Sequence, residues 1–243
     1  MTLRLGIMLP QLGNYDQATD IADAARIAEA TGYDSVWAFE RFLYPRDQSG
    51  VHGFSRIPGR PWPRMHAGVA DPLITLTTAA AVTSTIQVGT SVLVPGLHLP
   101  GRLAKTLAGL DAASAGRLIA GLGNGWSVDE FAATGPRPFD ERGDALDEFL
   151  EIADAVWSAD PVTFENDRYA ITRADVGPKP ARTIPVAIGG NGPLALARVA
   201  RRGDAWMPIA LPPERFSHSW LRSARARSQQ AATRQASDAS SKW

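Results

Sequence analysis

The 243-residue sequence predicts an α/β fold with parallel strands, as three observations indicate, and its length suits one α/β barrel or two smaller domains. First, Ile86 to Val94 and Arg117 to Leu122 are apolar runs separated by a helical segment over about 101–114. Together they have the length of a strand–helix–strand unit with parallel strands, about 35 residues. Second, similar runs alternate with helical patterns along the chain. Third, the runs are almost continuously apolar, which is typical of strands covered by helices on both faces.

The N-terminal segment predicts one further strand–helix–strand unit. Leu3 to Leu9 is expected to form a buried strand that stops at Pro10. Asp16 to Thr31 has apolar residues at helical spacing, and Gly32 suits the position that follows a helix. Ser35 to Phe39 is expected to form the second strand.

The segment Glu40 to Ala70 lacks a sustained period and contains four prolines and four glycines. A long loop inside a compact domain is usually functional or disordered. It leaves the carboxyl end of the second strand, where barrels place their sites, so we interpret it as a substrate lid, with a mobile insertion as the alternative. Its aromatic residues favour a small, largely apolar substrate: Phe42, Tyr44, Phe54 and Trp62. His52 and His66 lack metal-ligand spacing.

The remaining elements follow from local patterns. Asp71 is expected to cap a helix that begins at Pro72. Asp140 to Trp157 predicts an amphipathic helix, and Val162 to Tyr169 a small hairpin. A short helical turn is expected at Val128 to Thr134 and a helix at Pro193 to Arg202. Six barrel strands are expected in total, at about 3–9, 35–39, 86–94, 117–122, 184–188 and 204–209.

A closed barrel needs eight strands, so the predicted barrel is incomplete. From Glu214 onward the sequence is rich in Ser, Ala, Arg and Gln and contains no strand pattern. A helix with a disordered end is expected there. We therefore expect a barrel domain over 1–212 and a tail over 213–243.

Composition excludes several classes of function. Lys plus Arg and Asp plus Glu both number 25, which gives no electrostatic reason to expect nucleic acid or an anionic membrane as a partner. There is no cysteine, which excludes disulfides, thiolate metal sites and a cysteine nucleophile and suits a cytoplasmic protein. No apolar run approaches the ~18 residues of a membrane helix, and no signal peptide is expected.

Candidate binding residues lie where strands end. Glycines between a strand and a helix allow backbone N–H groups to approach an anion, which makes a phosphate cradle; a tight turn is the alternative. Hydroxyls at the end of a strand can bond a cofactor edge, or be ordinary strand residues. The candidates are Gly189, Gly190 and Asn191, then Gly123, Asn124 and Gly125, and then Thr90, Ser91 and Val92.

Glu40 and Arg41 follow the second strand and are the candidate catalytic pair. They are interpreted as an acid–base pair or, alternatively, as a salt bridge at the rim. His98 is a candidate proton carrier, but a loop histidine with no visible partner is more often structural. Trp37 and Trp157 are expected in the core.

The order and spacing of several motifs resemble the luciferase-like flavin-dependent oxidoreductases, especially the deazaflavin (coenzyme F420) branch. The resemblance covers about residues 3 to 212. Its motifs are Gly32-Tyr33-Asp34-Ser35-Val36-Trp37, Asp71-Pro72-Leu73, Val88-Gly89-Thr90-Ser91-Val92, Gly116-Arg117-Leu118, Gly121 to Trp126, Asp129-Glu130-Phe131, Glu141-Arg142, Leu146-Asp147-Glu148, Ala155-Val156-Trp157, Pro178-Lys179-Pro180, Ile188-Gly189-Gly190 and Gly203-Asp204-Ala205-Trp206.

The resemblance implies a (β/α)8 barrel with the cofactor at the carboxyl ends of the strands. It implies a non-prolyl cis peptide at Ser91-Val92 that supports the deazaflavin ring. Gly189-Gly190 would hold the cofactor phosphate, with Gly123-Asn124-Gly125 alongside. The implied activity is hydride transfer between coenzyme F420 and a small molecule. The alternatives are an FMN-dependent monooxygenase that uses oxygen and a non-catalytic remnant.

Two departures from the family qualify this interpretation. Members commonly carry an acidic residue and then a catalytic histidine after the second strand, whereas this chain has Glu40 and Arg41. Arginine stays protonated and shuttles protons poorly, so it would instead stabilise an anionic cofactor or substrate. Glu40 is then the candidate polar group at the reacting centre.

The second departure is the absence of two further strand–helix units after 204–209. We expect a truncated chain, for example through a frameshift near Pro213. Missing strands would leave sheet edges unpaired. Such a chain is expected to need a partner, to form oligomers such as a homodimer, or to be unstable.

Overall fold

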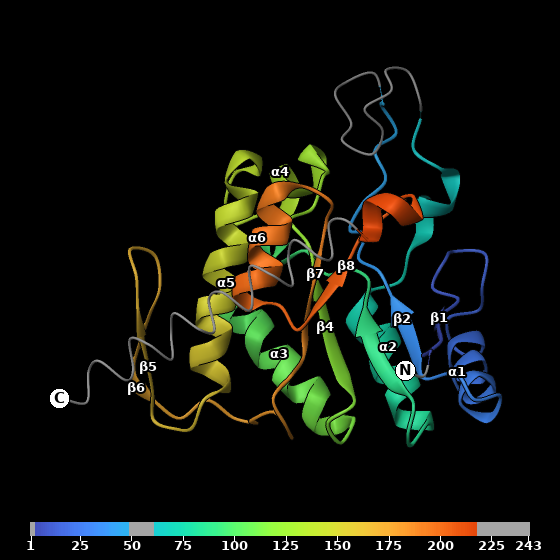
Figure 1. Cartoon of the computed structure of the whole chain (residues 1–243), viewed down its shortest axis with the longest axis horizontal. Coiled ribbons are helices and arrows are strands. Elements are labelled where there is room, and N and C mark those ends of the chain that lie inside the picture. Colours follow the sequence, from blue (N-terminus) through green and yellow to red (C-terminus); the bar gives the residue numbers. More distant parts are fainter. Residues whose placement is uncertain (1–2, 49–60, 218–243) are drawn as a thin grey trace. The chain divides into compact units, whose positions relative to one another are not determined.

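The computed structural model describes residues 3–48 and 61–217 (Figure 1). The chain divides into two compact units, Met1–Ile184 and Pro185–Trp243, which are considered separately below. The proposed domain boundary at 212 remains a prediction. His52, Phe54 and the tail beyond 217 lie outside the described residues.

The first unit is built on four parallel strands in the order β1-β2-β3-β4. Their register places Met8 beside Trp37, Trp37 beside Gly89, and Gly89 beside Ile119. Because the strands are parallel, their carboxyl ends lie at one edge of the sheet. The strands are β1 (Gly6–Met8), β2 (Ser35–Ala38), β3 (Gln87–Thr90) and β4 (Leu118–Leu122), close to the predicted positions.

The expectation that the first strand is buried is wrong. β1 pairs with β2 on one side, and no described strand pairs with its other edge within the first unit. All three of its residues are consequently exposed, Ile7 by 41% and Met8 by 47%.

Helices follow the strands of this unit in sequence, as predicted. The predicted cap at Asp71 and the predicted glycine after the first helix are both confirmed. Asp71 caps α2 by accepting from the N–H groups of Leu73 (2.8 Å) and Ile74 (2.9 Å), and Gly32 has φ +86° after α1. The helices are α1 (Asp20–Ala30), α2 (Pro72–Val82), α3 (Pro100–Ala113), α4 (Val128–Thr134) and α5 (Arg142–Trp157), with 3-10 turns η1 (Arg64–Gly68), η2 (Pro95–Leu97) and η3 (Phe139–Glu141).

The amphipathic helix predicted at 140–157 is confirmed as η3 followed by α5. Leu146 and Phe149 of its apolar stripe are fully buried. Trp157 is half-buried, and its indole N–H donates to Ala104 O of α3 at 2.9 Å, which links α5 to α3. A hairpin also forms, but it extends beyond the predicted 162–169: β5 (Val162–Glu165) pairs with β6 (Ala170–Ala174).

The second unit contains β7 (Val186–Gly189), α6 (Pro193–Arg202) and β8 (Ala205–Met207). β7 and β8 are parallel, with Ile188 beside Trp206. Residues 213–217 are helical, in agreement with the helix expected after the last strand. With the four strands of the first unit, the described residues contain the six parallel strands that the sequence predicts.

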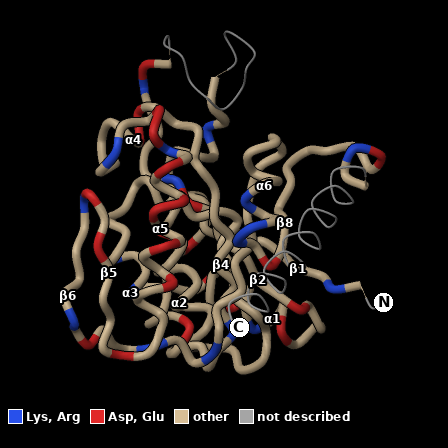
Figure 2. The backbone as a smooth tube through the Cα atoms, turned by 60° about the vertical axis from the view of Figure 1, so that its left-hand side comes forward, with Lys and Arg blue, Asp and Glu red and all other residues tan. Residues whose placement is uncertain are grey.

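Acidic and basic residues are interspersed along the described chain, as Figure 2 shows, in agreement with its zero formal charge. Among the residues the structure describes, no helix is long and apolar enough to cross a bilayer. A cytoplasmic location remains a prediction.

Candidate functional site

The predicted site segments of the first unit lie together at the carboxyl ends of β2, β3 and β4. Backbone hydrogen bonds continue past the strands and join them. Glu40 N donates to Val92 O (3.2 Å), Leu93 N to Gly121 O (2.8 Å) and Gly123 N to Leu93 O (2.9 Å). The topology therefore brings Glu40, Ser91-Val92 and Gly123-Asn124-Gly125 to one edge of the sheet.

The peptide between Ser91 and Val92 is cis, as the resemblance implies. The loop after β4 lies directly against it. A Cβ atom on Gly123 would lie 2.6 Å from Val92 Cγ2, which is closer than two carbon atoms can approach. Gly125 has φ +74°, a conformation that favours glycine. Packing against the 91–94 segment thus explains why this loop is glycine-rich.

Two polar candidates differ in availability. Thr90 is fully buried, and its hydroxyl donates to Gly121 O at 2.7 Å, which fixes β3 to β4. Asn124 is half-buried, and its side chain has no hydrogen-bond partner within 3–48 and 61–217. Asn124 therefore offers both amide groups to a ligand, whereas the Thr90 proton is already engaged. Roles for both in cofactor binding remain predictions.

Glu40 is 9% exposed, and both of its carboxylate oxygens have partners. Oε2 accepts from the Val94 N–H at 2.6 Å, and Oε1 lies 2.5 Å from His98 Nε2. His98 follows η2, just after β3. A partner for this histidine was not visible in the sequence because the two residues are 58 positions apart. The order of the strands could have indicated the contact, however, because Glu40 and His98 follow neighbouring parallel strands.

Glu40 also determines the protonation of His98. Burial by itself lowers the pKa of the imidazole, but the hydrogen bond and charge of Glu40, with the charge of Asp71, outweigh burial. The net effect raises the pKa of His98 above its ordinary value. Glu40 and Asp71 therefore favour the protonated form of His98.

Arg41 forms a buried ion pair with Glu130 of α4. Its Nη1 lies 2.9 Å from Glu130 Oε2, with side-chain exposures of 7% and 5%. The guanidinium also lies over the rings of Trp126 (4.2 Å) and Trp62 (5.1 Å). The other carboxylate oxygen of Glu130 accepts from Phe42 N at 2.7 Å. Arg41 therefore fixes the start of the 40–70 loop against α4; a catalytic role for it remains a prediction.

Sequence reasoning missed Glu130 as a partner of Arg41. Ser127 caps α4 by accepting from Glu130 N at 3.2 Å, a spacing that signals the helix start but not a partner 89 residues away. Burial raises the pKa of Glu130, although Arg41 and the backbone N–H groups of the loop oppose this.

The described parts of the 40–70 loop pack over this ion pair. Trp62 is 2% exposed and meets Trp126 edge-on at 4.6 Å. The Tyr44 hydroxyl donates to Trp62 O at 3.3 Å. Gln11, fully buried, joins the two ends of the loop through bonds to Phe39 N (2.6 Å) and Ala70 O (3.1 Å). The lid role of this loop remains a prediction.

The glycine turn of the second unit is tied to the end of β8. Asn191 donates to Ile209 O at 2.6 Å and accepts from Ile209 N at 3.0 Å, so its side chain holds the turn. Gly190 has φ +117° and accepts from the Trp206 indole N–H at 2.7 Å. The turn leads into α6, whose N-terminus is suited to an anion. The phosphate role of Gly189, Gly190 and Asn191 remains a prediction.

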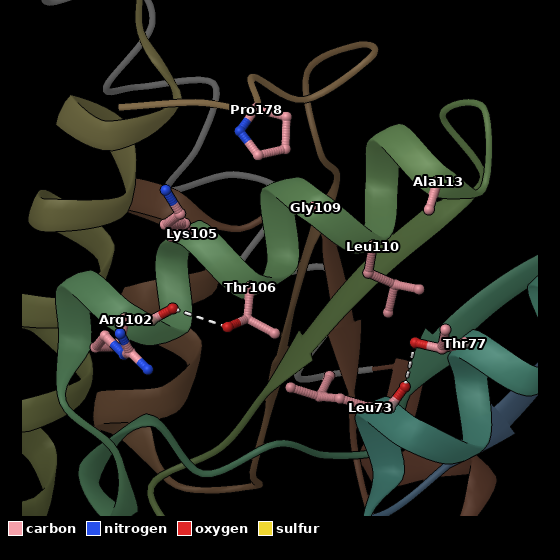
Figure 3. Close-up of a pocket in the computed structure, with 9 residues that line it drawn as sticks. All are labelled: Leu73, Thr77, Arg102, Lys105, Thr106, Gly109, Leu110, Ala113 and Pro178. Carbon is pink, nitrogen blue, oxygen red and sulfur yellow. Dashed lines mark hydrogen bonds between the residues drawn. The ribbon is translucent and has the colours of Figure 1, made fainter. Parts of the chain in front are cut away.

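A cleft of about 460 Å³ lies between α2 and α3 (Figure 3). It lies on helices rather than at the strand ends. The hydroxyls of Thr77 and Thr106 donate to carbonyl oxygens one turn earlier in their own helices, at 2.7 and 2.9 Å, as the dashed lines in Figure 3 show. Arg102 and Lys105 of α3 also line the cleft, but none of the predicted site residues does, and we do not place the active site there.

Residues 4–240 match the luciferase-like monooxygenase family, and the chain belongs to this family of oxidoreductases. The F420-dependent glucose-6-phosphate dehydrogenase of Amycolatopsis mediterranei is 31% identical over 191 residues, which are 77% of this chain and 52% of that protein. The chain thus spans about half the length of this relative.

Two solved structures share the fold. An F420-dependent secondary alcohol dehydrogenase in complex with an F420-acetone adduct has a TM-score of 0.74 at 24% identity, covering 94% of this chain and 66% of that one. The oxygenating constituent of 3,6-diketocamphane monooxygenase from Pseudomonas putida, in complex with FMN, has a TM-score of 0.72 at 18% identity, covering 94% and 63%. The predicted class, a luciferase-like α/β barrel fold, is confirmed.

Proposed function

We propose that this protein is a coenzyme F420-dependent oxidoreductase that transfers hydride between the deazaflavin and a small, largely apolar organic substrate. The observation that carries the proposal is the edge at the ends of β2, β3 and β4. There the segment Ser91-Val92 packs against the glycine loop Gly123-Asn124-Gly125, beside the buried carboxylate of Glu40.

Asn124 and the segment beside it support a cofactor at this edge. Close packing of Gly123 against Val92 fixes the loop after β4, and the amide of Asn124 in that loop is available for a hydrogen bond. Ser91, Val92, Gly123, Asn124 and Gly125 would contact the ring system. We propose that Gly189, Gly190 and Asn191 hold the phosphate. When bound, a deazaflavin supplies a two-electron hydride donor or acceptor at its C5 carbon.

The protein's own contribution is position, exclusion of water and placement of charge. The Trp62 and Trp126 rings and the buried Arg41–Glu130 pair close one flank of the site. Glu40 is the buried carboxylate beside the proposed ring position, and its orientation is fixed by the Val94 N–H. A substrate oxygen would therefore meet a defined polar group in a largely apolar surrounding.

FMN with oxygen is the second candidate, because the solved monooxygenase with the same fold carries FMN. Titration with deazaflavin and, separately, with FMN distinguishes the two, with binding followed by quenching of tryptophan fluorescence. We expect saturable binding of the deazaflavin. Tight binding of FMN alone would favour the monooxygenase, and binding of neither by the folded protein would indicate a non-catalytic remnant.

A matched pair of glycine variants locates the site. Gly123→Ala places a Cβ 2.6 Å from Val92 Cγ2 and should weaken deazaflavin binding by about tenfold or more, which corresponds to about 1.4 kcal/mol. In Gly109→Ala, on α3, the new Cβ meets nothing closer than 4.0 Å, and binding should be unchanged. Equal affinities in the two variants would place the cofactor elsewhere.

A further inference from the structure

His98 and Glu40 form a carboxylate–imidazole pair at the carboxyl ends of β3 and β2. We propose that His98, oriented by Glu40, is the proton carrier of this site, exchanging a proton with the oxygen of an alcohol or carbonyl substrate. The inference rests on the proposed function. It assigns the proton to a residue in the segment after β3, whereas the Glu40–Arg41 pair that the sequence suggests follows β2.

The geometry fixes the orientation of the imidazole. Glu40 Oε1 lies 2.5 Å from His98 Nε2, and Glu40 Oε2 is held by the Val94 N–H at 2.6 Å. The carboxylate cannot rotate without losing one of these bonds. Since a carboxylate accepts, the neutral imidazole carries its proton on Nε2 and presents a lone pair on Nδ1.

The second ring nitrogen is available. Nδ1 of His98 bonds to nothing in the part of the chain that the structure describes, and the His98 side chain is 30% exposed. In the proposal, a ligand bound at the strand ends contacts this nitrogen. Arg41 does not compete for the role, because its guanidinium stays protonated and pairs with Glu130.

The charges around His98 favour reversible protonation. Glu40 faces it from the end of β2 and Asp71 from the N-terminus of α2, and both raise its pKa against the effect of burial. Arg41 and Glu130 form an ion pair with each other, and the pKa of His66 is lowered by burial and by the charge of Arg41. His98 is thus the histidine of this cluster that gains a proton most readily.

The proposed step conserves atoms and electrons. In alcohol oxidation, a bound deazaflavin would accept the hydride, with its two electrons, from the substrate carbon. The hydroxyl proton would pass to His98 Nδ1 as the carbonyl group forms. In the reverse direction the protonated His98 donates its Nδ1 proton to the carbonyl oxygen as the carbon receives hydride. Oxidation thus requires neutral His98, and reduction requires its protonated form.

Proton NMR titration of the protein without cofactor tests the pair directly. The His98 resonance, assigned by its loss in His98→Gln, should titrate above the ordinary value of about 6.5. Glu40→Gln should lower the midpoint by about one unit or more, and Asp71→Asn, which retains a helix cap, by less. A midpoint at or below the ordinary value, or one unchanged in Glu40→Gln, would overturn the proposal, whatever the protein turns over.

Kinetics distinguish a proton carrier from a structural histidine. The probe is oxidised coenzyme F420 with 2-propanol, a small and largely apolar alcohol. Wild-type oxidation should rise with pH around the His98 midpoint. His98→Gln should lower kcat by about 100-fold or more and abolish that dependence, while deazaflavin affinity changes less than about twofold.

The failure of each proposal has its own signature. Unchanged kcat and pH dependence in His98→Gln would exclude His98 as the carrier and leave the proposed function intact. A wild-type protein that binds no deazaflavin would instead refute the proposed function. Glu40→Gln should shift the pH dependence in the same direction as the NMR midpoint, which a purely structural role would not do.

Discussion

Arg41 and Glu130 show how one residue changes what its neighbours can do. Arginine after β2 places a permanent charge where a titratable group would otherwise stand, and burial then requires a counter-ion. Glu130 supplies it and at the same time accepts from the loop N–H of Phe42. The pair therefore holds the start of the 40–70 loop, and in our proposal His98, oriented by Glu40, carries the proton.

Removing the cation should be costly. Arg41→Met leaves Glu130, 5% exposed, without its ionic partner and should destabilise the protein by about 3–5 kcal/mol in urea unfolding. Arg41→Met with Glu130→Gln should recover part of this loss, because no charge remains buried. Arg26→Met breaks an exposed pair with Asp23 and should change stability by less than about 1 kcal/mol. Similar losses in Arg41→Met and Arg26→Met would show that the buried pair contributes little.

At the scale of elements, Glu29 joins the end of α1 to the turn between α2 and β3. Its carboxylate accepts from Ser84 N (2.9 Å), Thr85 N (2.6 Å) and Ile86 N (2.9 Å). Burial raises the pKa of Glu29, but the effect of these hydrogen bonds is larger, and the net result is a pKa of about 2. Arg117, which precedes β4, donates hydrogen bonds to Thr83 Oγ1 and Ile86 O in the same turn and so links this turn to β4.

The sign of this shift defines a pH test. Because its pKa is lowered in the folded protein, the ionised Glu29 stabilises the fold at pH values above about 4.3, the pKa of glutamate in the unfolded chain. This stabilisation is lost as the pH falls towards 2. Glu29→Gln should therefore lose about 1–3 kcal/mol at pH 7, measured by urea unfolding, and the difference from wild type should shrink on acidification. Glu151→Gln, on the exposed side of α5, is the control. A Glu29→Gln deficit that is independent of pH would contradict the role of the charge.

Elements were easier to predict than contacts. The apolar runs, the Asp71 cap and the stripe of α5 are local patterns, so strands and helices could be placed to within a few residues. The pairs Glu40–His98 and Arg41–Glu130 join residues 58 and 89 positions apart, and no local pattern encodes such distances. Topology supplies them, because parallel strands bring their carboxyl ends to one edge. That rule indicated the region of the candidate site but not the partners within it.

On the scale of the whole molecule, β1 departs furthest from the pattern of a closed barrel. Its apolar sequence suits a strand covered on both sides, yet its outer edge has no strand partner among the described residues of the first unit. Leu3 is 82% exposed and Leu5 54%. An open, apolar edge strand promotes association with other chains, and natural proteins usually protect such edges with charged residues.

The exposed edge should make the isolated protein associate with itself as its concentration rises. Leu5→Lys should suppress this, because the ammonium group would have to be buried in an edge-to-edge contact. Its backbone bonds with Asp34 should survive, since they do not involve the side chain. Leu194→Lys, which charges an equally apolar and 73% exposed position on α6, controls for a general effect of charge. Sedimentation velocity at increasing concentration measures the outcome. If wild type stays monomeric throughout, or if both variants act alike, the β1 edge is not the surface through which chains associate.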